Sequence, residues 1–148
     1  MATPPRRAVE TALEKYFELG ARAAGHPHAD WNRWVDLFTE DALYVEVQYG
    51  TFHGREEIRK WIVKTMATVP DMYFPPIKWQ LIDGDRVAFC IDNALPNPDP
   101  KGEPIAFPTV SLLQYRDGLW CYEEDIYDVR LSERAKQQFA AARAGKGK

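Results

Sequence analysis

The sequence predicts an α+β domain in which helices come first and an antiparallel sheet follows. Apolar residues recur at helical spacing in three stretches before residue 67, whereas beyond residue 76 they mostly alternate with a period of two. Hydrophobic residues make up 45% of the 148 residues, which is enough for one sizeable core. Helices followed by strands are typical of helices packed on one face of an antiparallel sheet.

The first two helices are predicted from their apolar stripes. The first spans roughly residues 6–24, and its stripe is Val9, Leu13, Tyr16 and Phe17. The segment from Gly25 to His28 ends it, and Asp30 can then cap a second helix. The buried stripe of that helix is predicted to be Trp31, Trp34, Val35 and Phe38.

After Asp41 the period changes to two, which predicts a strand. Leu43, Val45 and Val47 fall on one face, and the polar or aromatic side chains Tyr44, Glu46 and Gln48 fall on the other. Gly50 and Gly54 are expected to bracket a loop. A third helix follows, with the stripe Ile58, Trp61, Ile62, Thr65 and Met66.

The second half of the chain predicts an antiparallel meander. Residues 77–81 and 87–95 flank the hairpin turn at Asp83-Gly84, and strands near 105–116 and 119–129 flank Asp117-Gly118. Ser132 can cap a last helix whose inner side carries Ala135 and Phe139. We expect one domain over residues 1–148, with frayed ends at 1–5 and 144–148.

Composition excludes several classes of protein. A net charge of −3 without a basic stripe argues against a nucleic-acid partner, and no apolar run is long enough to span a membrane. With two cysteines and no secretory signal, a cytoplasmic protein with free thiols is expected. His26 and His28 have the chemistry of metal ligands but no third ligand nearby, so neither a metal nor a cofactor is expected.

Three motifs resemble a known superfamily. They are Phe38-Thr-Glu-Asp-Ala-Leu-Tyr-Val-Glu46, Gly54-Arg-Glu-Glu-Ile58 and Asp117-Gly-Leu-Trp120. With the order of elements, they resemble the superfamily of nuclear transport factor 2, ketosteroid isomerase and SnoaL over roughly residues 8 to 130. The resemblance implies a cone-shaped, cystatin-like roll, in which a curved sheet wraps the N-terminal helices around a deep apolar pocket. It implies no single activity, because this fold supports several.

Two enzymes of the superfamily suggest site residues. In ketosteroid isomerase the catalytic carboxylate lies four residues after the alanine of the first motif, which places it at Glu46. The oxyanion-binding groups of that enzyme correspond to Tyr16 and to Ser111. In limonene epoxide hydrolase the strand residues match Tyr44 and Glu46, and the two catalytic aspartates match Asp92 and Asp125. The arginine between those aspartates is replaced here by Cys90.

The strand patterns leave alternatives open for the acidic residues. The face that carries Glu46 either lines the pocket or faces water. Asp92 either faces the pocket together with Cys90 or forms the turn before Pro96. Asp125 shares its face with Glu123 and Tyr127, but a register shift of one residue would put Glu124 there instead. Tyr16 either binds substrate or is a tyrosine of the core.

These residues predict a cofactor-independent enzyme that performs acid/base chemistry on a small, mostly apolar, oxygenated molecule. Asp125 and Glu46 are expected to act as bases and Asp92 as a proton donor. Tyr44 and Tyr16 are expected to orient a substrate oxygen, and Ser111, Tyr127 and Cys90 to contact the substrate. The alternative is a non-catalytic ligand-binding or accessory protein. A homodimer through the outer face of the sheet is also expected. Trp79 and Trp120 either belong to the core, like the other tryptophans, or cover that outer face.

Overall fold

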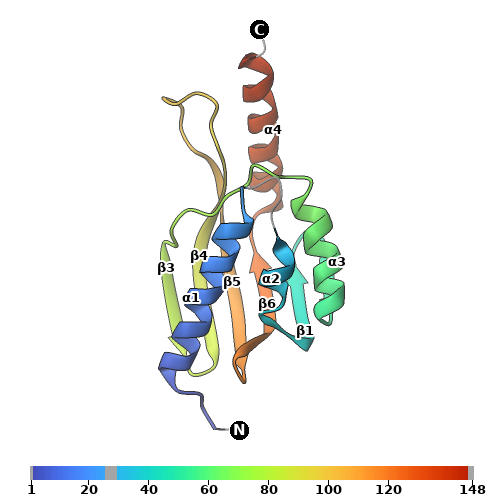
Figure 1. Cartoon of the computed structure of the whole chain (residues 1–148). Coiled ribbons are helices and arrows are strands. Elements are labelled where there is room, and N and C mark those ends of the chain that lie inside the picture. The colour runs from blue at the N-terminus through green and yellow to red at the C-terminus, as the bar shows by residue number, and fades with distance from the viewer. Residues whose placement is uncertain (1, 26–29, 147–148) are drawn as a thin grey trace.

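The described part of the chain folds into four helices and six strands (Figure 1). A computed structural model describes residues 2–25 and 30–146. The helices are α1 (Arg6–Ala23), α2 (Trp31–Val35), α3 (Arg55–Met66) and α4 (Val129–Lys146). The strands are β1 (Phe38–Glu46), β2 (Gly50–His53), β3 (Trp79–Asp83), β4 (Arg86–Leu95), β5 (Ile105–Arg116) and β6 (Leu119–Ile126). The predicted loop at 26–29, with His26 and His28, lies outside the described residues.

The six strands form one sheet in the order β2-β1-β6-β5-β4-β3. All neighbours are antiparallel except β1 and β6, which are parallel. This pairing sets Tyr44 opposite Glu123 and Glu46 opposite Asp125. Two strands that lie about 80 positions apart in the sequence therefore contribute neighbouring side chains to one face of the sheet.

Helices α1, α2 and α3 cover one face of the sheet, which we call the inner face (Figure 1). The main core lies between these helices and the sheet. Its fully buried side chains include Val9, Leu13, Val35, Phe38 and Ile58. Within the described residues, none of the helices is long and apolar enough to cross a membrane. The predicted α+β class is confirmed, with the helices and sheet forming one layer each.

Helix α4 packs at the end of the sheet, beside the long loop between β4 and β5 (Figure 1). Ala135 and Phe139 face a second apolar cluster with Leu95, Ile105 and Phe107, as their spacing predicts. The helix begins earlier than predicted, because Asp128 caps it by accepting a hydrogen bond from the Arg130 amide at 2.9 Å. It also extends to Lys146, into the segment that was expected to fray.

Two boundaries near β1 differ from the sequence prediction. Phe38 belongs to the strand and not to the preceding helix, because α2 ends after five residues. The segment between Gly50 and Gly54 is the edge strand β2, which pairs with β1 from Leu43 to Glu46. Helix and strand patterns are hard to separate in segments as short as these, since both place some apolar residues on one side.

A β-bulge in β6 changes which side chains face the core. Gln114 pairs with Tyr122, whereas the next residue of β5 pairs with Trp120, so Cys121 is the extra residue. Trp120 is therefore turned into the core and only 1% exposed. Of the two alternatives for Trp120, the core is correct and the outer face is wrong. Trp79 does lie on the surface and is 45% exposed.

Helix α3 offers a test of this packing, because one side chain faces the core and another faces water. Ile58 is fully buried and Val63 is 40% exposed. Truncation of Ile58 to alanine is expected to cost about 2–5 kcal/mol of unfolding free energy, since it leaves a cavity. Val63→Ala, the control on the opposite face, is expected to change it by about 0.5 kcal/mol or less. Urea unfolding followed by tryptophan fluorescence measures both, and equal effects would contradict the fold.

Candidate active site

A pocket of about 520 Å³ lies between the helices and the inner face of the sheet. Its walls are mostly apolar and aromatic, with Phe17, Trp31, Trp34, Trp61 and Phe89 among them. A cavity of about 150 Å³ already holds a benzene ring, so this pocket has room for a larger molecule. The apolar pocket expected from the resemblance is therefore present.

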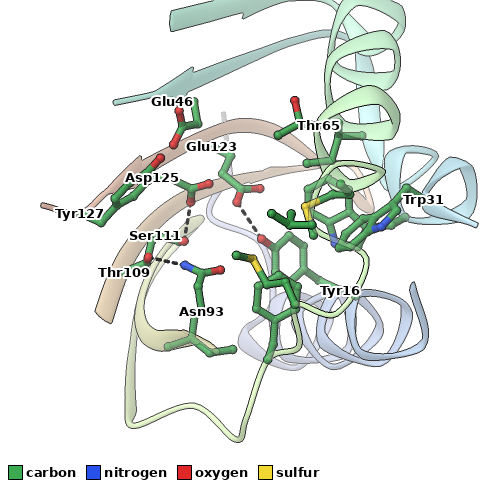
Figure 2. Close-up of a pocket in the computed structure, with 18 of the residues that line it drawn as sticks. Tyr16, Trp31, Glu46, Thr65, Asn93, Thr109, Ser111, Glu123, Asp125 and Tyr127 are labelled. Atoms are coloured by element: carbon green, nitrogen blue, oxygen red, sulfur yellow. Dashed lines mark hydrogen bonds between the residues drawn. The ribbon is translucent and has the colours of Figure 1, made fainter. Parts of the chain in front are cut away.

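The strands β1, β4, β5 and β6 each contribute polar side chains to the pocket (Figure 2). Tyr44 and Glu46 point inward and are 3% and 5% exposed. The alternating pattern of the sequence by itself did not decide whether they face the pocket or water. Val47 is 50% exposed and lies on the outside. The polar and aromatic face of β1 is therefore the pocket face, and its more apolar face is turned away.

Asp125 lies at the centre of the polar group. It accepts a hydrogen bond from the Ser111 hydroxyl at 2.6 Å and another from the Tyr44 hydroxyl at 2.5 Å. The residue that competed with it, Glu124, lies on the outer face and accepts a hydrogen bond from Tyr122 at 2.6 Å. The predicted register at Asp125 holds because the bulge at Cys121 precedes it, so that Glu123 and Asp125 keep the same face.

Glu123 is a site residue that the sequence analysis placed on the right face but did not select. It is 1% exposed and lies deeper than Asp125. The Tyr16 hydroxyl donates to its Oε1 atom at 2.7 Å (Figure 2). Its other oxygen, Oε2, is buried and has no partner among the described residues. The sequence did carry one signal for Glu123, namely that it shares a strand face with Asp125. A fully buried glutamate is rare in proteins unless it is paired, so its burial here calls for a reason.

The contacts of Tyr44 give a proton on Glu123 a hydrogen-bond partner. The Tyr44 hydroxyl oxygen lies 2.5 Å from Asp125 Oδ2 and 3.0 Å from Glu123 Oε1. A phenol carries one hydrogen, and the shorter contact takes it to Asp125. The longer contact is satisfied when Glu123 carries a proton and donates to the Tyr44 oxygen. Glu123, Tyr44 and Asp125 then form a continuous chain of hydrogen bonds.

The electrostatics agree with this assignment. Burial, and next the charge of Asp125, raise the pKa of Glu123 well above its ordinary value. Burial also raises the pKa of Asp125, but the hydrogen bonds from Ser111 and Tyr44 oppose that shift. Burial, followed by the neighbouring carboxylates, raises the pKa of Tyr16 and of Tyr44. These directions favour Glu123 as the group that holds the first proton and Asp125 as the anion.

Glu46 lines the pocket but is held differently. Its Oε2 atom accepts hydrogen bonds from the backbone amides of Gln48 and Tyr49, at 2.9 and 2.7 Å. The Tyr127 hydroxyl donates to Gln48 Oε1 at 3.2 Å, and burial followed by nearby Glu46 raises the pKa of Tyr127. Glu46 thus shapes the turn after β1, while its charge contributes to the raised pKa of Asp125.

Two predicted site residues do not face the pocket. On β4 the pocket side chains are Phe89, Ile91 and Asn93, so the alternate residues Cys90 and Asp92 point to the outer face. Asp92 forms an ion pair with Lys78, whose Nζ atom lies 2.8 Å from Oδ1. The predicted roles of Asp92 as proton donor and Cys90 as a substrate contact are wrong, because a one-residue offset reverses the face of a strand.

Other predicted residues enter the pocket with altered roles. The hydrogens of Tyr16, Tyr44 and Ser111, which were expected to bind substrate, are donated here to Glu123 and Asp125. Ser132, predicted to cap α4, is buried in its first turn and lines the pocket. Among residues 2–25 and 30–146, no cluster of three or more His, Cys, Asp or Glu side chains is suited to hold a metal ion.

A sheet that carries helices on its inner face and encloses an acid-lined pocket defines a domain of the nuclear transport factor 2-like class. The chain belongs to the family of SnoaL-like domains, whose model matches residues 13–123. No curated protein matches the chain by sequence. Both the expected superfamily and its fold are thereby confirmed.

Solved structures with the same fold support that assignment. An epoxide hydrolase of M. tuberculosis resembling limonene epoxide hydrolase has 16% identity and a TM-score of 0.70, covering 97% of this chain and 99% of its own. An NTF2-like protein of Anabaena variabilis has 14% identity and a TM-score of 0.69, covering 86% and 95%. A protein with a ketosteroid isomerase-like fold from Catenulispora acidiphila, solved with trimethylamine, has 26% identity and a TM-score of 0.60, covering 86% and 88%. The fold is therefore shared with an epoxide hydrolase.

Proposed function

We propose that this protein is an acid/base enzyme whose substrate is a small, mostly apolar molecule with a carbonyl or similar oxygen group. The observation that carries the proposal is the chain Glu123–Tyr44–Asp125, in which two carboxyl groups of an apolar pocket contact the same tyrosine hydroxyl. A simple carrier of apolar ligands has no need of such buried carboxyl groups, since each costs free energy to desolvate.

Asp125 is the base in this proposal. Its raised pKa makes it a stronger proton acceptor than an exposed aspartate, while its bonds to Ser111 and Tyr44 keep it ionised. It takes a proton from a carbon next to the substrate carbonyl, or from a water molecule. Glu46 supports this role by adding negative charge near Asp125.

Tyr44 and Glu123 supply the acid side. Once Asp125 has gained a proton it binds the Tyr44 hydrogen less strongly, and that hydrogen becomes available to the substrate oxygen on which charge develops. Glu123, protonated behind Tyr44, donates to the phenol oxygen and strengthens it as a donor. Tyr16 is a positioning residue, because it holds Glu123 Oε1 at 2.7 Å.

An exchange assay tests this function without knowledge of the natural substrate. In D₂O, a base that removes protons next to a carbonyl replaces them with deuterium, which proton NMR detects as loss of signal. We expect the protein to accelerate this exchange at carbon 2 of 1-tetralone, a bicyclic ketone of suitable size. Tetralone that binds without accelerated exchange would contradict proton abstraction and support the alternative of a non-catalytic binding protein.

A homodimer through the outer face of the sheet is part of the proposal. Three apolar side chains of that face are exposed: Trp79 by 45%, Leu81 by 67% and Ile126 by 46%. Apolar side chains exposed on a sheet face are typical of a protein–protein interface. Leu81→Glu is expected to convert a dimer into a monomer, since it places a charge in the interface. Leu131→Glu, on α4 and 37% exposed, is the control and should leave the dimer intact. Sedimentation velocity measures both; a monomeric wild-type protein would contradict the proposal.

A further inference from the structure

A second polar pair lies on the pocket wall, apart from the acidic group. Asn93 of β4 donates from Nδ2 to the Thr109 hydroxyl oxygen of β5 at 2.6 Å (Figure 2). Both residues line the pocket, and Thr109 is only 4% exposed. Neither takes part in the acid/base chain. Of the pocket residues two positions away on the same strands, Ile91 and Phe107 are apolar and Ser111 is polar.

The hydrogen bond of this pair leaves the Asn93 carboxamide oxygen able to accept from a ligand. The Asn93 carboxamide is turned into the pocket, and its oxygen lies on the side away from Thr109 (Figure 2). Within the described residues, the Asn93 side chain makes one hydrogen bond, to Thr109. A carboxamide oxygen in an apolar wall loses its water when a ligand fills the pocket, and that loss is offset when the ligand supplies a donor.

Strand geometry sets the distance between the two polar positions. Thr109 and Ser111 are two residues apart on β5 and both face the pocket. Ser111 bonds Asp125, and Thr109 bonds Asn93. Residues two apart on a strand are separated by about 7 Å. That distance is comparable to the span of one six-membered ring with substituents on opposite sides.

We infer that this pocket selects a ring compound with two oxygen substituents on opposite sides: a carbonyl whose oxygen faces the Tyr44 hydroxyl and whose neighbouring carbon faces Asp125, and a hydroxyl that donates to Asn93 Oδ1. The orientation toward Asp125 rests on the proposed function, whereas the contact with Asn93 does not. A site built to bond a hydroxyl group discriminates strongly against an analogue that cannot donate, because its own polar atom is then left without a partner. Asn93 is the specificity-determining residue.

Three matched ketones test the inference by binding. In 6-hydroxy-1-tetralone the hydroxyl lies across the aromatic ring from the carbonyl; 6-methoxy-1-tetralone can accept but not donate at that position, and 1-tetralone lacks the group. Calorimetric or NMR titration of the wild-type protein is expected to give about tenfold tighter binding of the hydroxy compound than of the methoxy compound. Equal affinities, or tighter binding of the methoxy compound, would overturn the inference.

Variants assign the preference to Asn93. Asn93→Leu is expected to reduce the tenfold ratio to less than twofold, while Asn93→Asp, which keeps an acceptor oxygen, is expected to retain it. Asp92→Asn, one residue away on the outer face, is the control and should keep the full ratio. An unchanged ratio in Asn93→Leu would overturn the role of Asn93, and the Asp variant guards against a loss caused by misfolding.

The experiments distinguish failure of the proposed function from failure of this inference. If carbon 2 of tetralone does not exchange but the hydroxy compound is preferred through Asn93, the acid/base function is wrong and this inference stands. If exchange depends on Asp125 but hydroxy and methoxy compounds bind equally, the inference is wrong and the function stands. Titration reads binding alone, so it does not depend on turnover.

Discussion

Replacement of Asp125 by asparagine is expected to lower the rate of proton exchange at carbon 2 of tetralone by about 10²- to 10⁴-fold, the usual contribution of a general base. Asparagine has nearly the same shape, and its one oxygen can still accept from either Ser111 or Tyr44, but it cannot take up a proton. The binding of tetralone should change far less than the rate. Exchange followed by proton NMR, with binding measured in parallel, separates the two quantities.

The protein contains a matched control for this experiment. Asp92→Asn is the same chemical change at a residue that points to the outer face and pairs with Lys78. We expect its exchange rate to stay within about twofold of wild type. If Asp125→Asn kept the wild-type rate, another group would be the base, and Glu46 would be the next residue to test because it also lines the pocket.

Glu123→Gln is expected to stabilise the protein increasingly as the pH rises. The pKa of Glu123 is raised in the folded state, so above the unfolded value of about 4.3 the folded protein binds more protons than the unfolded chain. The free energy of unfolding therefore falls as pH increases, by up to about 1.4 kcal/mol per pH unit for one proton, until the folded-state pKa is reached. Glutamine has no proton to lose, so the variant lacks this contribution.

The measurement is urea unfolding between pH 5 and 9, with the variant compared to wild type at each pH. The difference in unfolding free energy should grow with pH in favour of Glu123→Gln. Glu124→Gln is the control, because Glu124 lies on the outer face and bonds Tyr122. Its difference from wild type is expected to stay flat. A flat difference for Glu123→Gln would mean that Glu123 is not the protonated member of the chain.

Much of the fold could be predicted because its signals are local. The stripe of α1, the turn at Asp83-Gly84 and the strands that follow depend on residues close in sequence, and each was placed within a few positions. The motif that ends at Glu46 identified the superfamily, and through it the inward direction of Tyr44 and Glu46. Hydrophobicity alone would have turned that strand the other way, because Val45 and Val47 are the more apolar side chains.

The candidate site was predicted only in part, because its members depend on strand register. Asp125 was selected on the correct face, but on β4 the analysis selected Asp92 where the structure turns Asn93 inward. Successive side chains of a strand point to opposite faces, so an error of one residue exchanges the whole set. A signal was available on β4, because the larger apolar side chains Val87, Phe89 and Ile91 share the face of Asn93 and not that of Asp92.

The sequence by itself determined the class of fold, the order of its elements and a cluster of acids on its C-terminal strands. The tertiary structure alone decided that β1 lies parallel beside β6, which sets Tyr44 opposite Glu123. It also decided that the bulge at Cys121 turns Trp120 into the core while Glu123 stays beside Asp125. The physical reason is that long-range pairing and bulges are settled by how the whole sheet packs against its helices, for which a local pattern carries no signal.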